Sequence, residues 1–414
     1  MFVLRRGLAH FLVLYILCSV CVCVLVLPLP RAIALTRIGI DAHAHAQAPS
    51  PAHSHTHAHT HTRDDPFNCS QLAAAGAFRE HWLSNGRLNL SFVAYGGVVT
   101  RLLFPDAAGA ARDVVLGFDE PSRYCADAGG QHPYFGALIG RVANRIANGS
   151  FTLDGRAVTT PINEPAGNDT LHGGPLGFDR RVWRVEVLNA SAAVLRYDSA
   201  DGEEGFPAEV AVEVTYALTE DDRWQIEYVA KPRADTVIAL TQHTYWNLNG
   251  AQDTACEHVL GMASARRFLE VDEHLLPTGA FRSVREDDWM DFTRPKAVGR
   301  DIGRGRVTPF GGYDNAFVFG GWRRGQPPVA RLLALSPLSG IAMELITDQP
   351  SVQMYSGLPC STHPPPTPHP LPPPLLFHLL RFFLLDLITV DVPPFICWHP
   401  PLRIIRILLL SWSK

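Results

Sequence analysis

The chain has 414 residues, of which 47% are hydrophobic, so it is long enough for one large domain or two ordinary ones around a substantial core. Its formal net charge is −4, which argues against a general nucleic-acid-binding surface, because such a surface needs an excess of basic residues. Acidic partners and small neutral partners are compatible with this charge.

The first segment, residues 1–34, is typical of a secretory signal peptide. Arg5 and Arg6 give it a basic start, an uncharged apolar run follows over residues 11–27, and the small-x-small cleavage sequence Ala32–Ala34 ends it. The alternative is an uncleaved anchor, because the run is close to the shortest length that spans a bilayer. We favour a cleaved signal, which predicts a secreted or secretory-lumen protein with no membrane contact after cleavage.

A low-complexity stretch follows over residues 35–63, in which histidines alternate with Ala, Ser and Thr. Such a composition cannot bury a core, so we expect a disordered linker. The alternative is loose binding of zinc, copper or nickel by the imidazoles. We favour the solvated spacer and predict no metal site.

Sequons and cysteines bear on the cellular compartment of the chain. Asn-x-Ser/Thr sequons, together with the leader, fit passage through an oxidising secretory route; they begin at Asn68, Asn89, Asn148, Asn168 and Asn189. The body of the chain contains Cys69, Cys125 and Cys256. This odd number predicts at most one internal disulfide and a free thiol.

Residues 64–357 are predicted to form one all-β domain. Alternating apolar and polar residues, separated by turn residues, indicate paired strands over residues 182–198 and 208–232, and at 329–335 with 341–347. No long segment has a helical period, and no alternation of strand and helix is visible. The pattern favours a large antiparallel β-sandwich.

The last segment, residues 358–414, has a different character. Prolines crowd its first part, and two apolar runs follow that are broken by charged residues and are each shorter than a bilayer span. A membrane-associated tail is one interpretation. We favour a segment outside the fold, either disordered or produced by a frameshift, a retained intron or a gene-model error.

Four polar clusters stand out in the body, at residues 140–149, 168–179, 241–248 and 313–317. Together they combine amides, guanidinium groups, carboxylates and histidines with glycines and aromatic rings. Such groups can hold vicinal hydroxyls while an aromatic ring covers the C–H face of a sugar. Two of these clusters contain a histidine, a side chain that ordinarily exchanges protons near neutral pH. A single histidine is more often structural, but four clusters in one all-β chain indicate a sugar site.

These motifs are similar to those of a known family. The segments IGRVANRIANGSFTLDG, NDTLHGGPLGFDRRVW, TQHTYWNLNG, HLLPTG, YDNAF and TDQPSVQMYSG occur in order between about residues 92 and 355. The chain resembles the aldose 1-epimerase (galactose mutarotase) family. The resemblance implies a galactose mutarotase-like β-supersandwich that interconverts the α and β anomers of a free hexose, such as galactose or glucose, without a cofactor.

The resemblance also implies roles for individual residues. His243, in QHTYWNL, matches the general acid that protonates the ring oxygen. His172, in LHGG, matches the second catalytic histidine, which holds the substrate near the ring oxygen. The positions that match substrate-binding residues are Asn144 and Arg145 in ANRI, Asp314 in YDNAF and Gln349 in TDQPSVQ.

The family's general base has no counterpart in this sequence. It is a glutamate in a strand that follows the motif around Tyr355, whereas here no glutamate follows Glu344. The resemblance therefore implies that the last strands and the base are missing, which puts activity in doubt. The alternative is a non-catalytic sugar-binding protein on the same sandwich. An isomerase of phosphorylated hexoses ranks below both, because its site needs additional arginines.

Overall fold

The computed structural model describes residues 69–125, 134–164, 167–250, 253–304, 312–357, 378–385 and 403–413. The chain divides into two units, Met1–Arg63 and Asp64–Lys414. The first unit, with the predicted leader and His-rich linker, lies outside the described residues. In the described part of the chain, no helix has both the length and the apolar character needed to cross a membrane.

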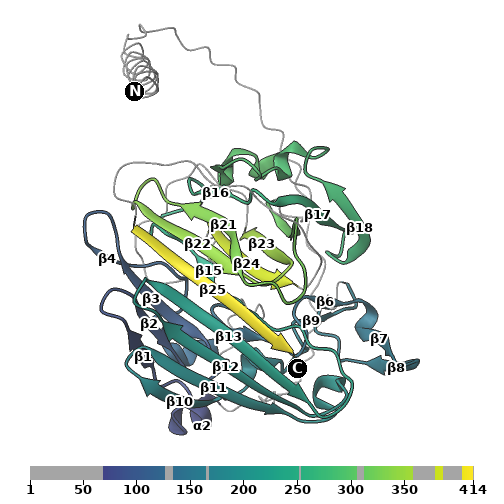
Figure 1. Ribbon diagram of the computed structural model, residues 1–414. Helices are drawn as coiled ribbons and strands as arrows, with labels where there is room; N and C mark the ends of the chain where they lie inside the picture. The colour runs from purple at the N-terminus through teal and green to yellow at the C-terminus, as the bar shows by residue number, and fades with distance from the viewer. Residues whose placement is uncertain are drawn as a thin grey trace, which may run out of the picture. The chain divides into compact units, whose positions relative to one another are not determined.

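Strands arranged in two large sheets and one smaller one form most of the second unit (Figure 1). The nine-stranded sheet contains, in spatial order, β10 (Arg184–Asn189), β11 (Ala192–Ser199), β12 (Val210–Leu218), β13 (Arg223–Pro232), β25 (Arg403–Ser413), β22 (Ile341–Thr347), β21 (Val329–Leu335), β16 (Val259–Gly261) and β19 (Lys296–Ala297). The six-stranded sheet contains β15 (Tyr245–Trp246), β24 (His378–Leu385), β23 (Ser351–Gly357), β20 (Asp314–Phe319), β17 (Ala265–Val271) and β18 (Pro277–Ser283).

The smaller elements complete the domain. A four-stranded sheet contains β1 (His81–Ser84), β2 (Asn89–Phe92), β3 (Val99–Pro105) and β4 (Ala111–Asp113). Short pairs join β5 (Leu138–Ile139) to β14 (Thr241–Gln242), β6 (Arg145–Ile146) to β9 (Thr170–Leu171), and β7 (Ser150–Leu153) to β8 (Arg156–Thr159). The helical elements are α2 (Cys69–Ala74) and the 3₁₀ turns η1 (Pro121–Tyr124), η2 (Ala147–Gly149), η3 (Phe178–Arg180), η4 (Glu203–Gly205), η5 (Asp288–Met290), η6 (Val298–Arg300) and η7 (Ile302–Arg304).

The hairpin of β12 and β13 shows why these sequences form strands. Alternate residues of β12, such as Val214 and Tyr216, are buried, and the residues between them are partly exposed. Tyr216 lies opposite Ile226 of β13, so the apolar faces of the two strands coincide. Each such side chain contributes roughly 1.5–3 kcal/mol when it is fully buried. The prediction of an all-β, mainly antiparallel sandwich is confirmed.

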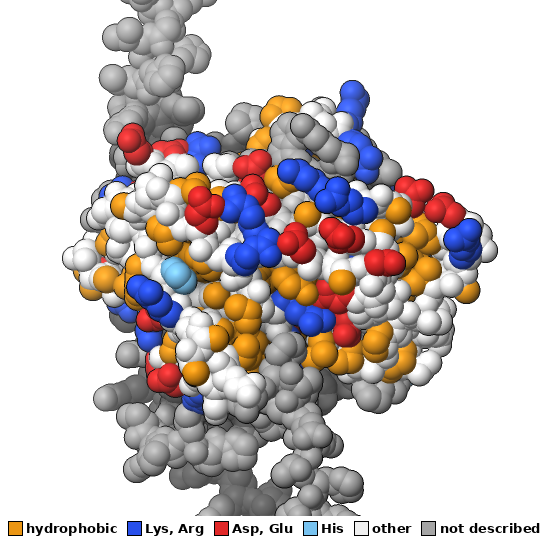
Figure 2. Space-filling view, turned by 90° about the horizontal axis from the view of Figure 1, so that it is seen from below, with side chains coloured by type: hydrophobic (Ala, Val, Ile, Leu, Met, Phe, Trp, Pro, Cys, Tyr) orange, Lys and Arg blue, Asp and Glu red, His pale blue; other side chains and the backbone are white. Residues whose placement is uncertain are grey.

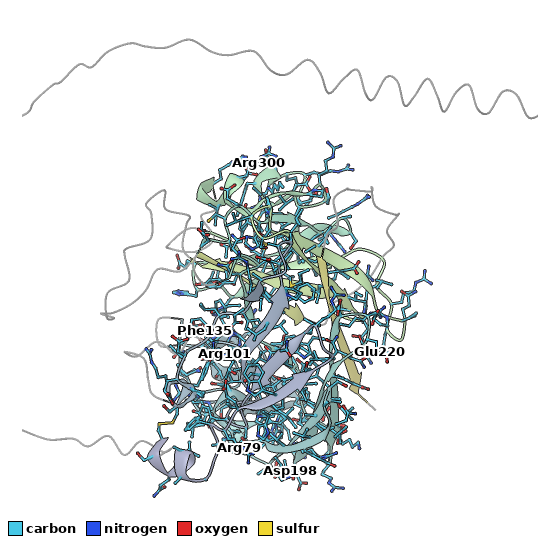
Figure 3. The ribbon with its side chains drawn as sticks, turned by 90° about the vertical axis from the view of Figure 1, so that its left-hand side faces the viewer. Arg79, Arg101, Phe135, Asp198, Glu220 and Arg300 are labelled. Carbon is cyan, nitrogen blue, oxygen red and sulfur yellow. A yellow bond between two sulfur atoms is a disulfide. The ribbon has the colours of Figure 1, made fainter. Side chains whose placement is uncertain are left out.

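A single large hydrophobic core joins strands of the three larger sheets; its buried aromatic residues include Phe92, Phe104, Tyr216, Trp224, Trp246, Phe317 and Phe319. The sticks in Figure 3 fill the space between the sheets, with Arg300 and Asp198 at opposite ends of the domain. On the face in Figure 2, acidic and basic side chains are interspersed, in keeping with the small net charge.

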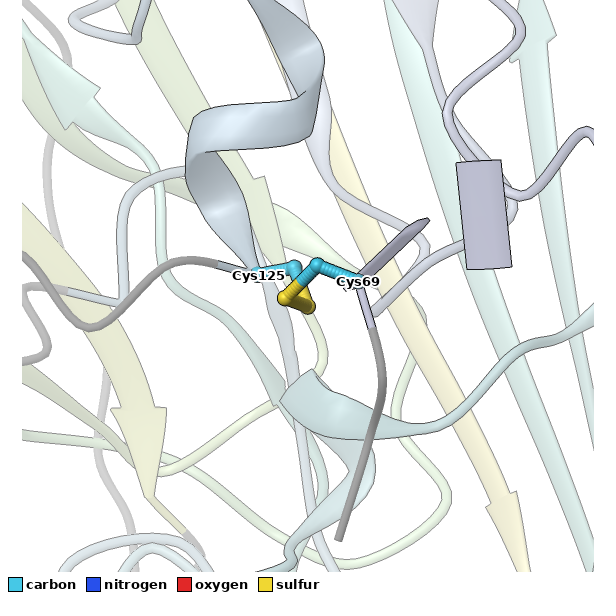
Figure 4. The surroundings of a disulfide bond; sticks show 2 residues. All are labelled: Cys69 and Cys125. Atoms are coloured by element: carbon cyan, nitrogen blue, oxygen red, sulfur yellow. A yellow bond between two sulfur atoms is a disulfide. The ribbon is translucent and has the colours of Figure 1, made fainter. Parts of the chain in front are cut away.

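A disulfide joins Cys69 at the start of α2 to Cys125 just after η1 (Figure 4). The two cysteines are 56 residues apart, so closing this loop stabilises the folded chain by roughly 4 kcal/mol. Cys256 is disulfide-bonded as well. The expectation of a free thiol among the three cysteines of the body is therefore wrong.

The tail differs from the expectation that residues 358–414 take no part in the fold. β24 lies between β15 and β23, and β25, the yellow strand in Figure 1, runs parallel to both β13 and β22. The physical reason is that β13, β22 and β23 offer backbone donors and acceptors at their edges, and apolar segments rich in Ile, Leu and Phe pair readily with such edges. The proline-rich segment 358–377 lies outside the described residues.

Candidate active site

Two histidines from distant parts of the sequence meet in the second unit. His172 directly follows β9, and His243 lies between β14 and β15. Their ring centroids are 5.0 Å apart and the rings meet edge to face. Both side chains are buried, and the ring of Tyr134 packs against His172 at 4.8 Å and against His243 at 5.3 Å. The structure therefore brings together the two histidines that the sequence singled out.

The backbone of Asn144 fixes the orientation of the His172 ring. The Asn144 N–H donates to Nδ1 of His172 at 2.9 Å, and the His172 N–H donates to the Asn144 carbonyl at 3.0 Å. Because Nδ1 accepts, a neutral His172 carries its proton on Nε2 and can donate from that atom. Both residues have positive φ, 66° for Asn144 and 53° for His172. Such backbone conformations are uncommon outside glycine and concentrate at functional sites.

The glycine after His172 allows two motifs to touch through their backbones. Gly173 has a φ of +90°, and a Cβ at this position would lie 2.0 Å from the carbonyl oxygen of Gly140. The neighbouring Arg141 has a structural role, since its buried guanidinium donates to Ser199 Oγ at 2.6 Å and to the Pro207 carbonyl at 2.7 Å. These contacts hold the motif that contains Asn144 against the strands behind it.

Arg145 is held by a carboxylate that the sequence motifs did not reveal. Its Nε donates to Oε2 of Glu164 at 2.5 Å and its NH2 to Oε1 at 2.8 Å, so the pairing is bidentate. The Arg145 side chain is only 11% exposed. Glu164 forms a backbone bridge with Asp169, three residues before His172, which places its carboxylate beside β6. The pairing restricts where the guanidinium of Arg145 can point.

A second polar group lies on β20 and β23. Asp314 begins β20, and Nε2 of Gln353 donates to its Oδ1 at 2.7 Å. Asp314 lies opposite Tyr355, whose ring is 6.2 Å from Tyr245. The ring of Tyr245 is in turn 5.5 Å from His243. This row of aromatic rings connects the strand of Asp314 to the histidine pair.

The structure places the two glutamines of the TDQPSVQ motif differently. Gln349 lies in the turn between β22 and β23, where its Nε2 donates to Asp348 at 2.7 Å. Gln353, four residues later, is the glutamine whose side chain accompanies Asp314. The motif TDQPSVQ contains both, and strand alternation decides between them, because Gln353 and Tyr355 share a face of β23 with Asp314 opposite.

Of the two strands beside β23, β20 carries Asp314, whereas β24 has no acidic residue. β24 has the sequence HLLRFFLL, and its register places Arg381 opposite both Tyr245 and Tyr355. Three carboxylates that belong to the predicted site or contact it already accept hydrogen bonds; they are Glu164, Asp314 and Asp348. Within the described ranges, no group of three His, Cys, Asp or Glu side chains could hold a metal ion. The His-rich segment lies outside those ranges.

The arrangement is that of an acid–base site for a polyhydroxylated ligand. Buried imidazoles can exchange protons, while a held guanidinium, a carboxylate and an amide can bind hydroxyl groups. On an all-β sandwich, these groups define a class of carbohydrate-handling enzymes.

Comparisons with known proteins place the chain within that class. The family model for aldose 1-epimerase matches residues 80–363. Galactose mutarotase from Bos taurus is 38% identical over 284 residues, which cover 68% of this chain and 78% of the relative. A probable aldose 1-epimerase from Arthroderma benhamiae is 34% identical over 309 residues, covering 69% of this chain and 70% of the relative.

A solved structure agrees with these sequence comparisons. The crystal structure of a GalM/aldose epimerase homologue from C. elegans superimposes with a TM-score of 0.62 and 29% identity, covering 74% of this chain and 89% of that chain. This chain belongs to the aldose 1-epimerase family, whose members are isomerases that interconvert the anomers of sugars.

Proposed function

We propose that this chain acts on the anomeric carbon of a free hexose as an aldose 1-epimerase, with galactose or glucose as the substrate. The observation that carries the proposal is the contact between the rings of His172 and His243 at 5.0 Å. The galactose mutarotases among the relatives support a galactose-type substrate. No step of the reaction requires a cofactor.

The proposed roles are those that the family resemblance implies, and the contact between the two histidines supports them. His243 donates a proton to the ring oxygen, and His172, through Nε2–H, holds the same oxygen or its neighbouring hydroxyl. As the O1 proton leaves, the C1–O5 bond breaks and an open-chain aldehyde forms; rotation about C1–C2 and reclosure give the other anomer. Each positioned proton transfer contributes about 10²–10⁴-fold to the rate. Asn144, Arg145 and Asp314 bind hydroxyl groups, and Gln353 takes the place first given to Gln349.

The O1 proton requires an acceptor. No glutamate follows Glu344 in the chain, and β24, the neighbour of β23, has no acidic residue. We infer that water accepts this proton and that turnover is slower than in relatives with a glutamate base. The same observation favours a second candidate function, a sugar-binding protein without catalysis.

Polarimetry on freshly dissolved α-galactose separates the two functions. We expect the optical rotation to relax faster than in the buffer blank, and the excess rate to disappear in His243→Ala while galactose binding, followed by saturation-transfer NMR, persists. Relaxation at the rate of the blank with galactose binding intact would leave only the binding protein. Absence of both relaxation and binding would reject both functions.

We also propose that the chain passes through the secretory pathway. The predicted leader supports this, as do the disulfide of Cys69 with Cys125 and the exposure of Asn148, Asn168 and Asn189 in their sequons. Endoglycosidase treatment of the protein from eukaryotic cells should increase its electrophoretic mobility. Recovery of the protein from the cytosol, without glycans, would contradict this proposal.

A further inference from the structure

A cavity outside the candidate active site lies at one edge of the six-stranded sheet. Its volume is about 610 Å³, within the roughly 300–1,000 Å³ typical of small-molecule sites. β17, β18, β20 and the segments around η5 and η7 line it; the residues that matter here are Phe268, Glu270, Arg282, Asp287, Trp289 and Asn315.

This cavity and the candidate active site lie on opposite faces of β20. Successive side chains of a strand point to opposite faces, so Asn315 points away from the face that carries Asp314. Asn315 lies opposite Met354, a core residue, whereas Asp314 lies opposite Tyr355 of the aromatic row. A ligand in the cavity would therefore be separated from the histidine pair by the sheet.

Asn315 provides a buried acceptor that lacks a partner. Its side chain is 1% exposed, and Nδ2 donates to the Leu269 carbonyl at 3.3 Å. Within the described part of the chain, its Oδ1 has no hydrogen-bond partner. An unsatisfied buried acceptor destabilises a fold, so this oxygen favours an occupant that brings a hydroxyl or amine proton into the cavity.

The charges of the lining argue against an anionic occupant. Arg282 pairs with Asp287 at 2.8 Å and with Glu270 at 3.5 Å. Arg304 pairs with Asp288 at 2.7 Å, so both guanidinium groups are already neutralised. Further carboxylates line the same cavity, and a phosphate or carboxylate ligand would meet a net negative surface.

The lining instead suits a neutral polyol. The carboxylates and the Asn315 amide oxygen accept protons from hydroxyl groups, and the arginine N–H groups donate to them. Trp289 and Phe268 add aromatic surface, with the half-buried indole of Trp289 stacked on Tyr313 at 5.7 Å. Aromatic surface beside polar groups is what the C–H face and hydroxyl edge of a pyranose need.

We propose that this cavity is a second carbohydrate-binding site, which takes a neutral saccharide through its hydroxyl groups and one C–H face. The saccharide needs no free anomeric carbon here, because the cavity and the histidine pair lie on opposite faces of β20. The site therefore binds glycosides that the isomerase cannot convert, and it does so independently of the proposed function.

Methyl β-galactopyranoside is a suitable probe, because its anomeric carbon is blocked. The full chain carrying Asp314→Asn, which weakens the opposite face, should still bind the probe in saturation-transfer NMR titrations. Adding Asn315→Leu or Glu270→Gln should weaken this residual binding about tenfold, the effect of losing one hydrogen bond to a charged or buried group. Glu270 is 38% exposed, so its variant tests the site without disturbing the core.

Three results would overturn the proposal. The first is a complete loss of probe binding in Asp314→Asn. The second is residual probe binding that is changed by neither Asn315→Leu nor Glu270→Gln. The third is binding of putrescine in place of the glycoside, which would make the occupant a cation. Each variant is compared at an unchanged melting temperature. Polarimetry on Glu270→Gln alone should give the parent's rate, so failure of the second site and failure of the isomerase are distinguishable.

Discussion

Replacing Glu164 by Gln removes the charge that holds Arg145 while keeping the size of the side chain. The amide can still accept one N–H from the guanidinium, but its NH₂ group faces the other donor at the 2.8 Å contact. A hydrogen bond to a charged group contributes about 1.5–3 kcal/mol. The side chain of Glu164 is 32% exposed, so water offsets part of the loss when one of its bonds to Arg145 is removed. A loss of about 1–1.5 kcal/mol predicts that the Kd for galactose rises roughly five- to tenfold.

The assay is a galactose titration by saturation-transfer NMR, followed by polarimetry at saturating sugar. In the proposed role, Arg145 binds hydroxyl groups that are present before and during the reaction, so we expect its displacement to raise KM and to leave kcat nearly unchanged. Glu186→Gln is the matched control, because it removes one of the two carboxylate partners of Arg196 on an exposed strand. An unchanged Kd for Glu164→Gln, with its melting temperature also unchanged, would refute the role given to this ion pair.

Three further predictions concern stability. Gly173→Ala places a methyl group 2.0 Å from the carbonyl oxygen of Gly140, at a φ of +90°. The substitution should therefore lower Tm in a calorimetric scan by roughly 4–8 °C. An unchanged Tm would contradict the close backbone contact. Burial lowers the pKa of His258 to about 4, whereas the unfolded histidine titrates near 6.5, so stability is lost as the pH falls through this range. In urea unfolding, the parent's free energy of unfolding should fall between pH 7 and pH 5 by about 2 kcal/mol more than that of His258→Gln. Asp113, whose pKa burial raises to about 6, makes the opposite contribution in both proteins, so it cancels in this comparison. In the same assay, the double variant Cys69→Ser, Cys125→Ser should have a free energy of unfolding roughly 4 kcal/mol below that of the oxidised parent. An unchanged free energy of unfolding would argue against that disulfide.

The parts of the fold with local signals could be predicted from the sequence. Strands β21 and β22 coincide with the predicted residues 329–335 and 341–347, because period-two alternation and the turn between them are properties of adjacent residues. His172 and His243 could be named as site residues only through motifs that resemble a family. Their contact depends on how β9, β14 and β15 meet, which no local pattern encodes.

Other features depend on partners that are distant in the sequence. Nothing in the residues near Glu164 indicates that it pairs with Arg145, since a lone glutamate in a turn is usually solvated. The choice between Gln349 and Gln353 required the register of β23 against β20. The strands β24 and β25 were missed because prolines nearby suggested an unstructured tail, while the edges that accept them come from strands far earlier in the chain.

The central claim, which is our proposal, is that His243 serves as the acid of the reaction and that the glutamate base implied by the family resemblance is missing. The most direct measurement is the mutarotation rate of α-galactose at constant pH as formate is added, after subtraction of the formate blank. Formate can occupy the place of a missing carboxylate, so we predict a protein-dependent rate that rises and then saturates with formate, and that is absent in His243→Ala. A protein-dependent rate that is already high and does not respond to formate would contradict the claim, because the chain would then supply its own base.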